Sequence, residues 1–178
     1  MDHELIAAFD DRVDAWFDKI RGNRFWDRLF YAASALGEFG LIWVIFALLR
    51  ALRGGERNER AAIRAIVATG IESVFVNVMM KAFFGRRRPS RRHDHPFPFR
   101  EPLSSSFPSG HATAAFCGAT LLSDGDPLWP LYYAVAIVVA ASRVHVKIHH
   151  ASDVVGGAIV GQVLGLIGKA IAPLDERN

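Results

Sequence analysis

Apolar residues recur along the chain in two patterns, the first periodic and the second continuous. Over residues 2–20 they fall three or four positions apart, which places them on one side of an α-helix and acidic residues on the other. The sequence therefore predicts an amphipathic helix at the amino terminus. Such a helix either packs on its own domain or lies among lipid headgroups, although helices at membrane surfaces usually have a basic polar face and this face is acidic.

Beyond this segment the apolar residues form long runs, which we compare with the ~20 residues that cross a bilayer as a helix. The candidate spans are 29–49, 61–84, 107–122, 128–146 and 154–172. The third run is short and rich in small residues, and the fourth reaches its length only by including Arg143 and His145. We predict an all-α fold in a single domain of residues 1–178. It consists of an amphipathic segment (1–28) and a bundle of about five transmembrane helices (29–172).

Small residues mark a packing face on the last predicted helix. Gly157, Gly161 and Gly165 repeat every fourth residue, so one side of this helix has no side chains. A neighbouring helix can then approach its backbone closely. We expect the contact to lie inside the bundle of one chain.

The composition agrees with a membrane protein that binds anions. Of the 178 residues, 51% are hydrophobic and 22% charged, and the net charge is +3. A basic excess of this kind admits anionic lipid, phosphorylated compounds or nucleic acid as partners. The chain has no soluble basic face that would suit nucleic acid, so we expect none as a partner.

Basic residues gather at one end of the predicted bundle. Because successive spans alternate in direction, the end of the second, the start of the third, the end of the fourth and the start of the fifth meet at one face. The basic residues of this face are Lys81, Arg86, Arg87, Arg88, Arg143 and Lys147. Clustered cations repel one another unless an anion lies among them, and arginine matches phosphate oxygens two at a time. The sequence therefore predicts a phosphate site.

The start of the third predicted helix, PSGH, reaches the same face. Ser109 is placed to cap this helix, and Gly110 lets the backbone approach a ligand. Free N–H groups at a helix start suit an anion. An ordinary serine-glycine helix start explains these residues equally well.

Two residues near the end of the fourth span have the chemistry of a nucleophile and its partner. His149 and Asp153 are four residues apart and share one face if this stretch is helical. The carboxylate can then hold one ring nitrogen of the imidazole and leave the other to attack phosphorus. His111 is placed to protonate the leaving oxygen and afterwards to activate water.

A metal site with two histidines and one carboxylate is the competing interpretation. Its candidate ligands are His145, His149 and Asp153, with His93, Asp94 and His95 in the preceding loop. Arg143 and Lys147 flank the first three and oppose a bound cation, so we expect no metal. The other polar residues of the spans, Glu38, Glu72 and Asn77, are expected to form hydrogen bonds between helices.

Together these motifs resemble those of the type 2 phosphatidic acid phosphatase (PAP2, or lipid phosphate phosphatase) family, in its small bacterial membrane form. The family pattern is a lysine, six residues and Arg-Pro; then Pro-Ser-Gly-His; then Ser-Arg, five residues, a histidine, three residues and an aspartate. The matching residues are Lys81, Arg88-Pro89, Pro108-Ser109-Gly110-His111, Ser142-Arg143, His149 and Asp153. Every spacing is kept, and the resemblance covers roughly residues 61–172.

The resemblance implies a role for each matching residue. His149 is the nucleophile that becomes phosphohistidine, Asp153 orients it, and His111 is the general acid. The phosphate-binding residues are Lys81, Arg88, Ser109, Gly110 and Arg143. The family needs no metal or other cofactor. The resemblance selects Arg88 among the three consecutive arginines, which leaves Arg86 and Arg87 to attract lipid headgroups.

The resemblance also implies a class of substrate and a location. Bacterial members act on polyprenyl diphosphates, phosphatidylglycerophosphate or phosphatidate at the outer side of the cell membrane. We favour a polyprenyl phosphate or diphosphate, of the undecaprenyl or decaprenyl type, because small members often serve cell-envelope synthesis. Arginines in the turn 50–60 draw that turn into the cytoplasm, so we expect the site at the extracytoplasmic face.

A catalytically silent protein that binds or transports lipid phosphates is the alternative from another class. Such a protein needs the arginines but not two histidines with an orienting carboxylate, so His111, His149 and Asp153 argue against it. A soluble acid phosphatase or vanadate-dependent haloperoxidase shares the central motifs. The long apolar runs argue against both.

Overall fold

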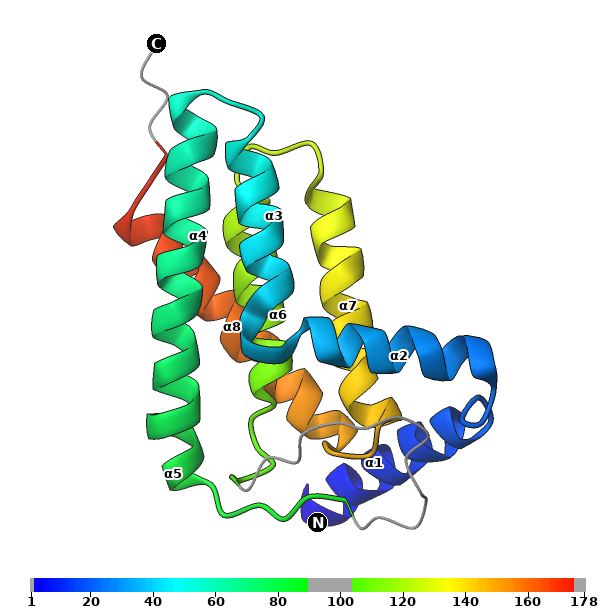
Figure 1. The fold of residues 1–178 in the computed structure, drawn as a ribbon. Helices are drawn as coiled ribbons and strands as arrows, with labels where there is room; N and C mark the ends of the chain where they lie inside the picture. Colours follow the sequence, from blue (N-terminus) through cyan, green and yellow to red (C-terminus); the bar gives the residue numbers. More distant parts are fainter. Residues whose placement is uncertain (1, 90–103, 175–178) are drawn as a thin grey trace.

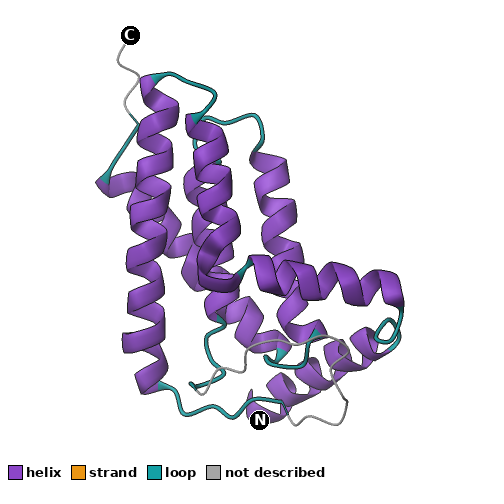
Figure 2. Cartoon of the chain, in the orientation of Figure 1, coloured by secondary structure: helices purple, strands orange, loops and turns teal. Residues whose placement is uncertain are grey.

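The computed structural model describes residues 2–89 and 104–174, and all regular structure within them is helical (Figures 1 and 2). In chain order the elements are α1 (Asp2–Asp18), α2 (Arg24–Leu36), the 3-10 helix η1 (Glu38–Gly40), α3 (Leu41–Ala51), α4 (Glu56–Val74), the π-helix η2 (Phe75–Met80), α5 (Lys81–Phe83), α6 (Gly110–Leu122), α7 (Trp129–His145) and α8 (Ala151–Ile171). The prediction of an all-α fold is confirmed.

Helix α6 forms the centre of the bundle. It packs against α8, α7, α4 and α3, and ten of its thirteen residues are buried. Most of these residues are small, because a helix surrounded on all sides leaves little space for long side chains. Figure 1 shows α3, α4 and α7 running alongside α6, with α8 crossing behind them.

The glycine face of α8 packs against α6, as predicted. A Cβ atom on Gly157 would lie 2.6 Å from the carbonyl oxygen of Ser109, and one on Gly165 would lie 2.6 Å from the Cβ of Thr120. One on Gly161 would overlap the backbone of Thr113. The two backbones therefore touch because these positions have no side chains.

The first predicted span is bent, so the expectation of one continuous helix over 29–49 is wrong. Helix α2 and the helix that follows it meet at 63°, and Phe39 and Gly40 at the bend have φ angles of 52° and 70°. Gly37 allows the bend to pack closely, since a Cβ there would lie 2.8 Å from both the His111 ring and Val139. Figure 1 shows α2 lying across the end of the bundle.

Two described helical segments, Glu56–Phe83 and Ala151–Ile171, are long and apolar enough to cross a membrane, and the bent pair of α2 and α3 is a third candidate. The first of these segments is continuous through the π-helix to α5. The predicted count of five spans stays a prediction, because α6 and α7 have only 13 and 17 residues.

Helix α1 packs on α7 and α8 through a face that contains both acidic and apolar residues, among them Asp10, Val13 and Phe17. Asp10 and Phe17 are each only 6% exposed, whereas Leu5 is 67% and Trp16 is 55% exposed. The apolar stripe of α1 is therefore divided: Val13, Phe17 and Ile20 pack on the protein, whereas Leu5 and Trp16 point away from it. Helix α1 thus packs on its own domain, and its predicted position among lipid headgroups stays a prediction.

The opposite end of the bundle contains buried arginines. Arg50 donates hydrogen bonds to the carbonyl oxygens of Leu122 (2.6 Å) and Asp124 (2.8 Å) and lies 3.3 Å from the Asp126 carboxylate. Arg64 pairs with the side chain of Asp124 at 2.7 Å. These arginines therefore join α3 and α4 to the turn between α6 and α7.

Candidate active site

The three motifs meet at the end of the bundle where α5 ends, α6 begins and α7 passes into α8 (Figure 1). Ser109 N–H donates to the carbonyl oxygen of Asp153 at 3.1 Å, which joins the starts of α6 and α8. A Cβ atom on Gly110 would lie 3.6 Å from the Lys81 ammonium group. The predicted gathering of these residues at one face is confirmed.

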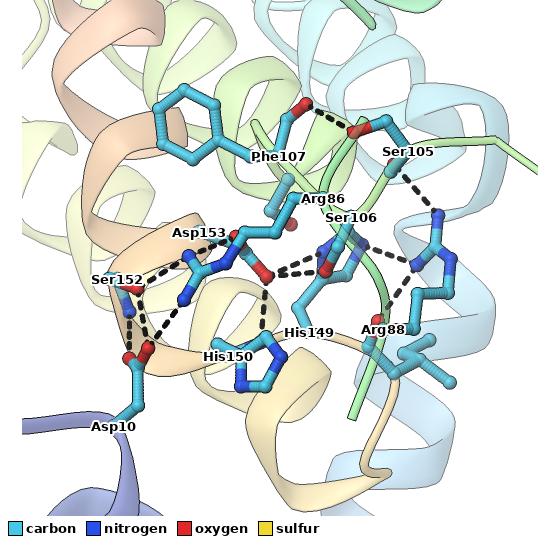
Figure 3. Close-up of polar contacts among 12 residues, drawn as sticks. Asp10, Arg86, Arg88, Ser105, Ser106, Phe107, His149, His150, Ser152 and Asp153 are labelled. Atoms are coloured by element: carbon cyan, nitrogen blue, oxygen red, sulfur yellow. Dashed lines mark hydrogen bonds and ion pairs between the residues drawn. The ribbon is translucent and has the colours of Figure 1, made fainter. Parts of the chain in front are cut away.

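His149 lies in the turn between α7 and α8 and is only 3% exposed. Its Nε2 atom is 3.2 Å from Nη1 of Arg88, and its Nδ1 atom is 3.7 Å from Oδ2 of Asp153 (Figure 3). Burial lowers the pKa of His149 to about 3; Asp153 opposes this shift, and the charges of Arg143 and Arg88 add to it. The imidazole is therefore neutral at physiological pH, as a nitrogen nucleophile must be.

His149 and Asp153 do not lie on the same helix, so the condition under which they would share one helical face is not met. Helix α8 begins at Ala151, after the cap residue His150, whose backbone N–H donates to Oδ2 of Asp153 at 2.8 Å. This capping contact ends the turn and starts the helix. Asp153 nevertheless reaches the imidazole, because the cap folds the turn back over the start of α8.

Asp153 is fully buried and held on both of its oxygens. Oδ1 accepts a hydrogen bond from Arg86 at 2.7 Å, and Oδ2 accepts from the hydroxyl group of Ser106 in addition to the His150 N–H. Sequence reasoning missed Ser106, which belongs to none of the motifs. Its only signal was a place in a serine run just before the Pro-Ser-Gly-His motif.

Arg86 corrects the interpretation of the three consecutive arginines. Its guanidinium donates to the side chains of Asp153, Ser152 and Asp10, each at 2.7 Å. The prediction that Arg86 only attracts lipid headgroups is therefore wrong. The partner Asp10 is 76 residues away in the sequence, on α1, so only the tertiary structure reveals the contact. Arg87 is exposed, and its predicted role stays a prediction.

Arg88 is held beside His149 by backbone carbonyl groups. It donates to Ile148 O at 2.8 Å, to Ser104 O at 3.1 Å and to Ser105 O at 3.2 Å. These contacts come from two chain segments, the serines before α6 and the residue before His149, and Figure 3 shows Arg88 beside Ser105. They fix a positive charge next to the Nε2 atom of His149, where an incoming phosphate would lie.

Ser109 occupies the cap position of α6 but does not cap the helix. Its backbone is extended, with φ −69° and ψ 109°, yet its side chain makes no cap hydrogen bond. The buried Oγ atom has no hydrogen-bond partner among the described residues. The predicted capping contact is therefore wrong, and the hydroxyl group is left for another partner near the start of α6, whose dipole favours an anion.

His111 and Arg143 face the bend between α2 and α3. The Nε2 atom of His111 lies 3.4 Å from the Glu38 carboxylate and 3.2 Å from Ser34 O, and Arg143 is hydrogen-bonded to the Ser34 hydroxyl group. The Nε atom of Arg143 is buried and has no hydrogen-bond partner within residues 2–89 and 104–174. Residues at the bend in the first predicted span therefore contact both His111 and Arg143.

The remaining polar residues of the spans differ in outcome. Glu38 contacts His111 on another helix, as expected. Asn77 instead bonds to Ser73 and Lys81 along its own helical segment. Both carboxylate oxygens of Glu72 are buried and have no hydrogen-bond partner in the part of the chain that the structure describes. The expectation of hydrogen bonds between helices is thus wrong for Asn77 and Glu72.

The sequence that carries these site residues matches a protein-family model. Residues 61–175 match the model of the PAP2 superfamily, which spans all three motifs. The chain belongs to the PAP2 superfamily. It is therefore a phosphatase, and its long apolar helices make it a membrane protein.

Characterised members of the superfamily are similar over most of the chain. A decaprenylphosphoryl-5-phosphoribose phosphatase from Mycobacterium tuberculosis is 34% identical over 81% of this chain and 79% of its own length. An undecaprenyl-diphosphatase from Sulfolobus acidocaldarius is 34% identical over 76% of this chain and 67% of its own. A PAP2-type phosphatidylglycerolphosphate phosphatase from Bacillus subtilis has the same fold, with a TM-score of 0.72 at 22% identity over 97% of this chain and 89% of its own.

Within the described residues of this PAP2 protein, His145, His149 and Asp153 do not form the competing metal site. His145 lies at the end of α7, and its Nε2 atom is 2.8 Å from the Asp27 carboxylate of α2. In the described part of the chain, no three histidine, cysteine, aspartate or glutamate side chains are placed to hold a metal. The other candidate ligands, His93, Asp94 and His95, lie outside the described residues.

Proposed function

We propose that this protein hydrolyses a lipid phosphate or diphosphate through a phosphohistidine intermediate on His149. The observation that carries the proposal is the placing of one neutral, buried imidazole between Arg88 and Asp153. One ring nitrogen faces a cation that would hold phosphate oxygens, and the other faces a carboxylate that would fix the ring. A binding protein has no need of this arrangement.

In the first step, Nε2 of His149 attacks phosphorus, and the bond from phosphorus to the leaving oxygen breaks. His111 donates a proton to that oxygen, and Asp153 stabilises the positive charge on the imidazole. In the second step, His111 accepts a proton from water as the water oxygen attacks phosphorus and the bond between phosphorus and Nε2 of His149 breaks, which releases inorganic phosphate and restores the neutral imidazole. The groups that bind the phosphoryl oxygens are Lys81, Arg88, Arg143, the Ser109 hydroxyl and the backbone N–H of Gly110.

We further propose a polyprenyl phosphate or diphosphate as the substrate. Two relatives with 34% identity act on decaprenyl and undecaprenyl compounds by name, which supports this class. Phosphatidylglycerophosphate is the second candidate, because the protein of that activity from Bacillus subtilis shares the fold.

Phosphate release from three lipids would test both proposals on one purified preparation. We expect turnover of undecaprenyl diphosphate to exceed that of phosphatidylglycerophosphate and phosphatidate. His149→Ala should abolish turnover while the protein still folds, and Asp153→Asn should nearly do so. Turnover that persists in His149→Ala would refute the phosphohistidine mechanism, and binding without phosphate release in the wild type would support the silent alternative.

The active site is proposed to face the extracytoplasmic side of the cell membrane. Arg87 is exposed next to the site, and the native Cys117 is buried, so an Arg87→Cys variant would carry one accessible thiol. We expect a membrane-impermeant maleimide to label this thiol in intact cells. Labelling only after permeabilisation would place the site in the cytoplasm.

A further inference from the structure

Asp10 on α1 is a buried carboxylate that lies outside every motif of the superfamily pattern. Only 6% of the residue is exposed. Oδ1 accepts the backbone N–H of Ser152 at 2.7 Å, and Oδ2 accepts the Ser152 hydroxyl group at 2.8 Å and Nη2 of Arg86 at 2.7 Å. The two contacts with Ser152 reach the first turn of α8, 142 residues further along the chain, and the third reaches Arg86 in the segment after α5.

Arg86 connects this carboxylate to the proposed catalytic pair. While Nη2 contacts Asp10, Nη1 of the same guanidinium donates to Oδ1 of Asp153 at 2.7 Å. Asp153 in turn lies 3.7 Å from the imidazole of His149. Figure 3 shows this series of side chains, from Asp10 through Arg86 and Asp153 to His149.

Arg86 needs a second anchor to hold Asp153 in one position. It follows the end of α5 in a non-helical segment, and its side chain is 31% exposed. A long side chain on such a segment has several rotamers of similar energy, and the contacts of Nη1 with Asp153 and the Ser152 hydroxyl group hold only one of its terminal nitrogens. The Asp10 carboxylate binds the other terminal nitrogen, Nη2. It thereby restricts the orientation of the guanidinium plane, because both terminal nitrogens of Arg86 then have fixed partners.

We propose that Asp10 is a positioning residue, which holds Arg86 and the start of α8 so that Asp153 keeps the His149 imidazole oriented for attack. The inference rests on the proposed function of His149. It gives α1 a part in the reaction, although this helix contributes no group that touches the substrate.

Docking of α1 does not depend on the charge of Asp10. Asp14, one turn further along, accepts Arg21 at 2.7 Å and Lys147 at 3.0 Å, and Phe17 is buried against Phe30. An asparagine at position 10 still offers an oxygen to the Ser152 N–H, while the ion pair with Arg86 is lost. Asp10→Asn therefore tests the positioning of Arg86 while α1 stays docked on the bundle.

Steady-state kinetics on undecaprenyl diphosphate would test the inference. We expect Asp10→Asn to lower kcat by about tenfold or more and to change KM by less than about twofold, because misorientation of a reacting group affects the chemical step. Asp11→Asn is the matched control on the exposed neighbour and should behave as the wild type. Asp14→Asn weakens the docking of α1, so it should lower the melting temperature and change kcat less than Asp10→Asn does.

A double-mutant cycle would show whether Asp10 acts through Arg86. We expect Arg86→Gln to lower kcat at least as much as Asp10→Asn, and the double variant to be no worse than Arg86→Gln alone. If Asp10→Asn does not fold, Arg86→Gln with Asp10 intact tests the same connection. Wild-type kcat in Asp10→Asn or in Arg86→Gln, or additive losses in the double variant, would overturn the inference. Activity in His149→Ala would overturn the proposed function instead.

Discussion

Gly161 provides a direct test of the contact between α6 and α8. A Cβ atom at this position would overlap the carbonyl oxygen of Thr113 and lie 2.9 Å from its carbonyl carbon and 3.0 Å from the Cys117 nitrogen. All three are backbone atoms, so no side-chain rotation relieves the contact. We predict that Gly161→Ala forces the two helices apart and lowers the melting temperature in detergent.

The size of the effect follows from two opposing terms. Ordinary carbon contacts begin near 3.4 Å, so the backbones must separate by at least about half an ångström along the α6–α8 contact. Overpacking of this kind costs about 1–3 kcal/mol, and alanine returns up to about 1 kcal/mol through its better helix propensity. Each kcal/mol corresponds to roughly 2–4 °C in melting temperature for a domain of this size. We therefore expect a loss of several degrees.

The effect should extend to catalysis, because the same contact joins the starts of both helices at Ser109 and Asp153. Gly70 on α4 is the matched control, since a Cβ there would meet nothing within 4 Å. Gly70→Ala should raise the melting temperature slightly through helix propensity. If Gly161→Ala melts at or above the wild-type temperature, the close backbone contact does not exist and the packing described for α8 is wrong.

Three further predictions concern separate polar groups. Ser109→Ala should leave the melting temperature unchanged, because its hydroxyl group caps nothing, and should lower kcat/KM in the phosphate-release assay. Glu72→Met should stabilise the protein by about 1–3 kcal/mol in thermal melts, because it removes a buried carboxylate without hydrogen bonds. Burial raises the pKa of Asp126, but hydrogen bonds, chiefly from Arg53, outweigh it and leave the pKa below the usual 3.8. The stability that the contact between Asp126 and Arg53 contributes is therefore fully present above pH 3.8 and is lost as the pH falls through the lowered pKa of Asp126. The melting temperature should therefore fall less for Asp126→Asn than for the wild type when the pH is lowered from 5 to 3.

Residue spacing was sufficient to predict the parts of the site that lie near helix ends. Successive spans run in opposite directions, so the end of one lies at the same face as the start of the next. The proximity of Lys81, Gly110 and Asp153 could therefore be predicted from the sequence. The glycine face of α8 could also be predicted, since glycines at every fourth position lie on one side of a helix. Both inferences depend only on helical geometry, which is local.

Contacts made by long side chains across the fold could not be predicted in this way. Arg86 and Arg88 both precede the Pro-Ser-Gly-His motif at the same face, and nothing in the sequence shows that one binds Asp10 while the other lies beside His149. The bend at Phe39 and Gly40 was missed for a related reason. Glycines within an apolar run are compatible with a continuous helix, and the positive φ angles at the bend and the close approach of the His111 ring to Gly37 appear only in the tertiary structure.

The acidic face of α1 was the feature that fitted the sequence interpretation least well. Helices at membrane surfaces usually present basic residues to lipid phosphates, with the apolar side in the bilayer. Here two of the acidic residues face the protein, where Asp10 meets Arg86 and Asp14 meets Lys147, while Leu5 and Trp16 face outward. These two negative charges are therefore complementary to the basic end of the bundle and have no need of a lipid partner. An acidic polar face thus does not argue against a helix at the membrane surface whose outward apolar residues are covered by lipid, and that position of α1 stays a prediction.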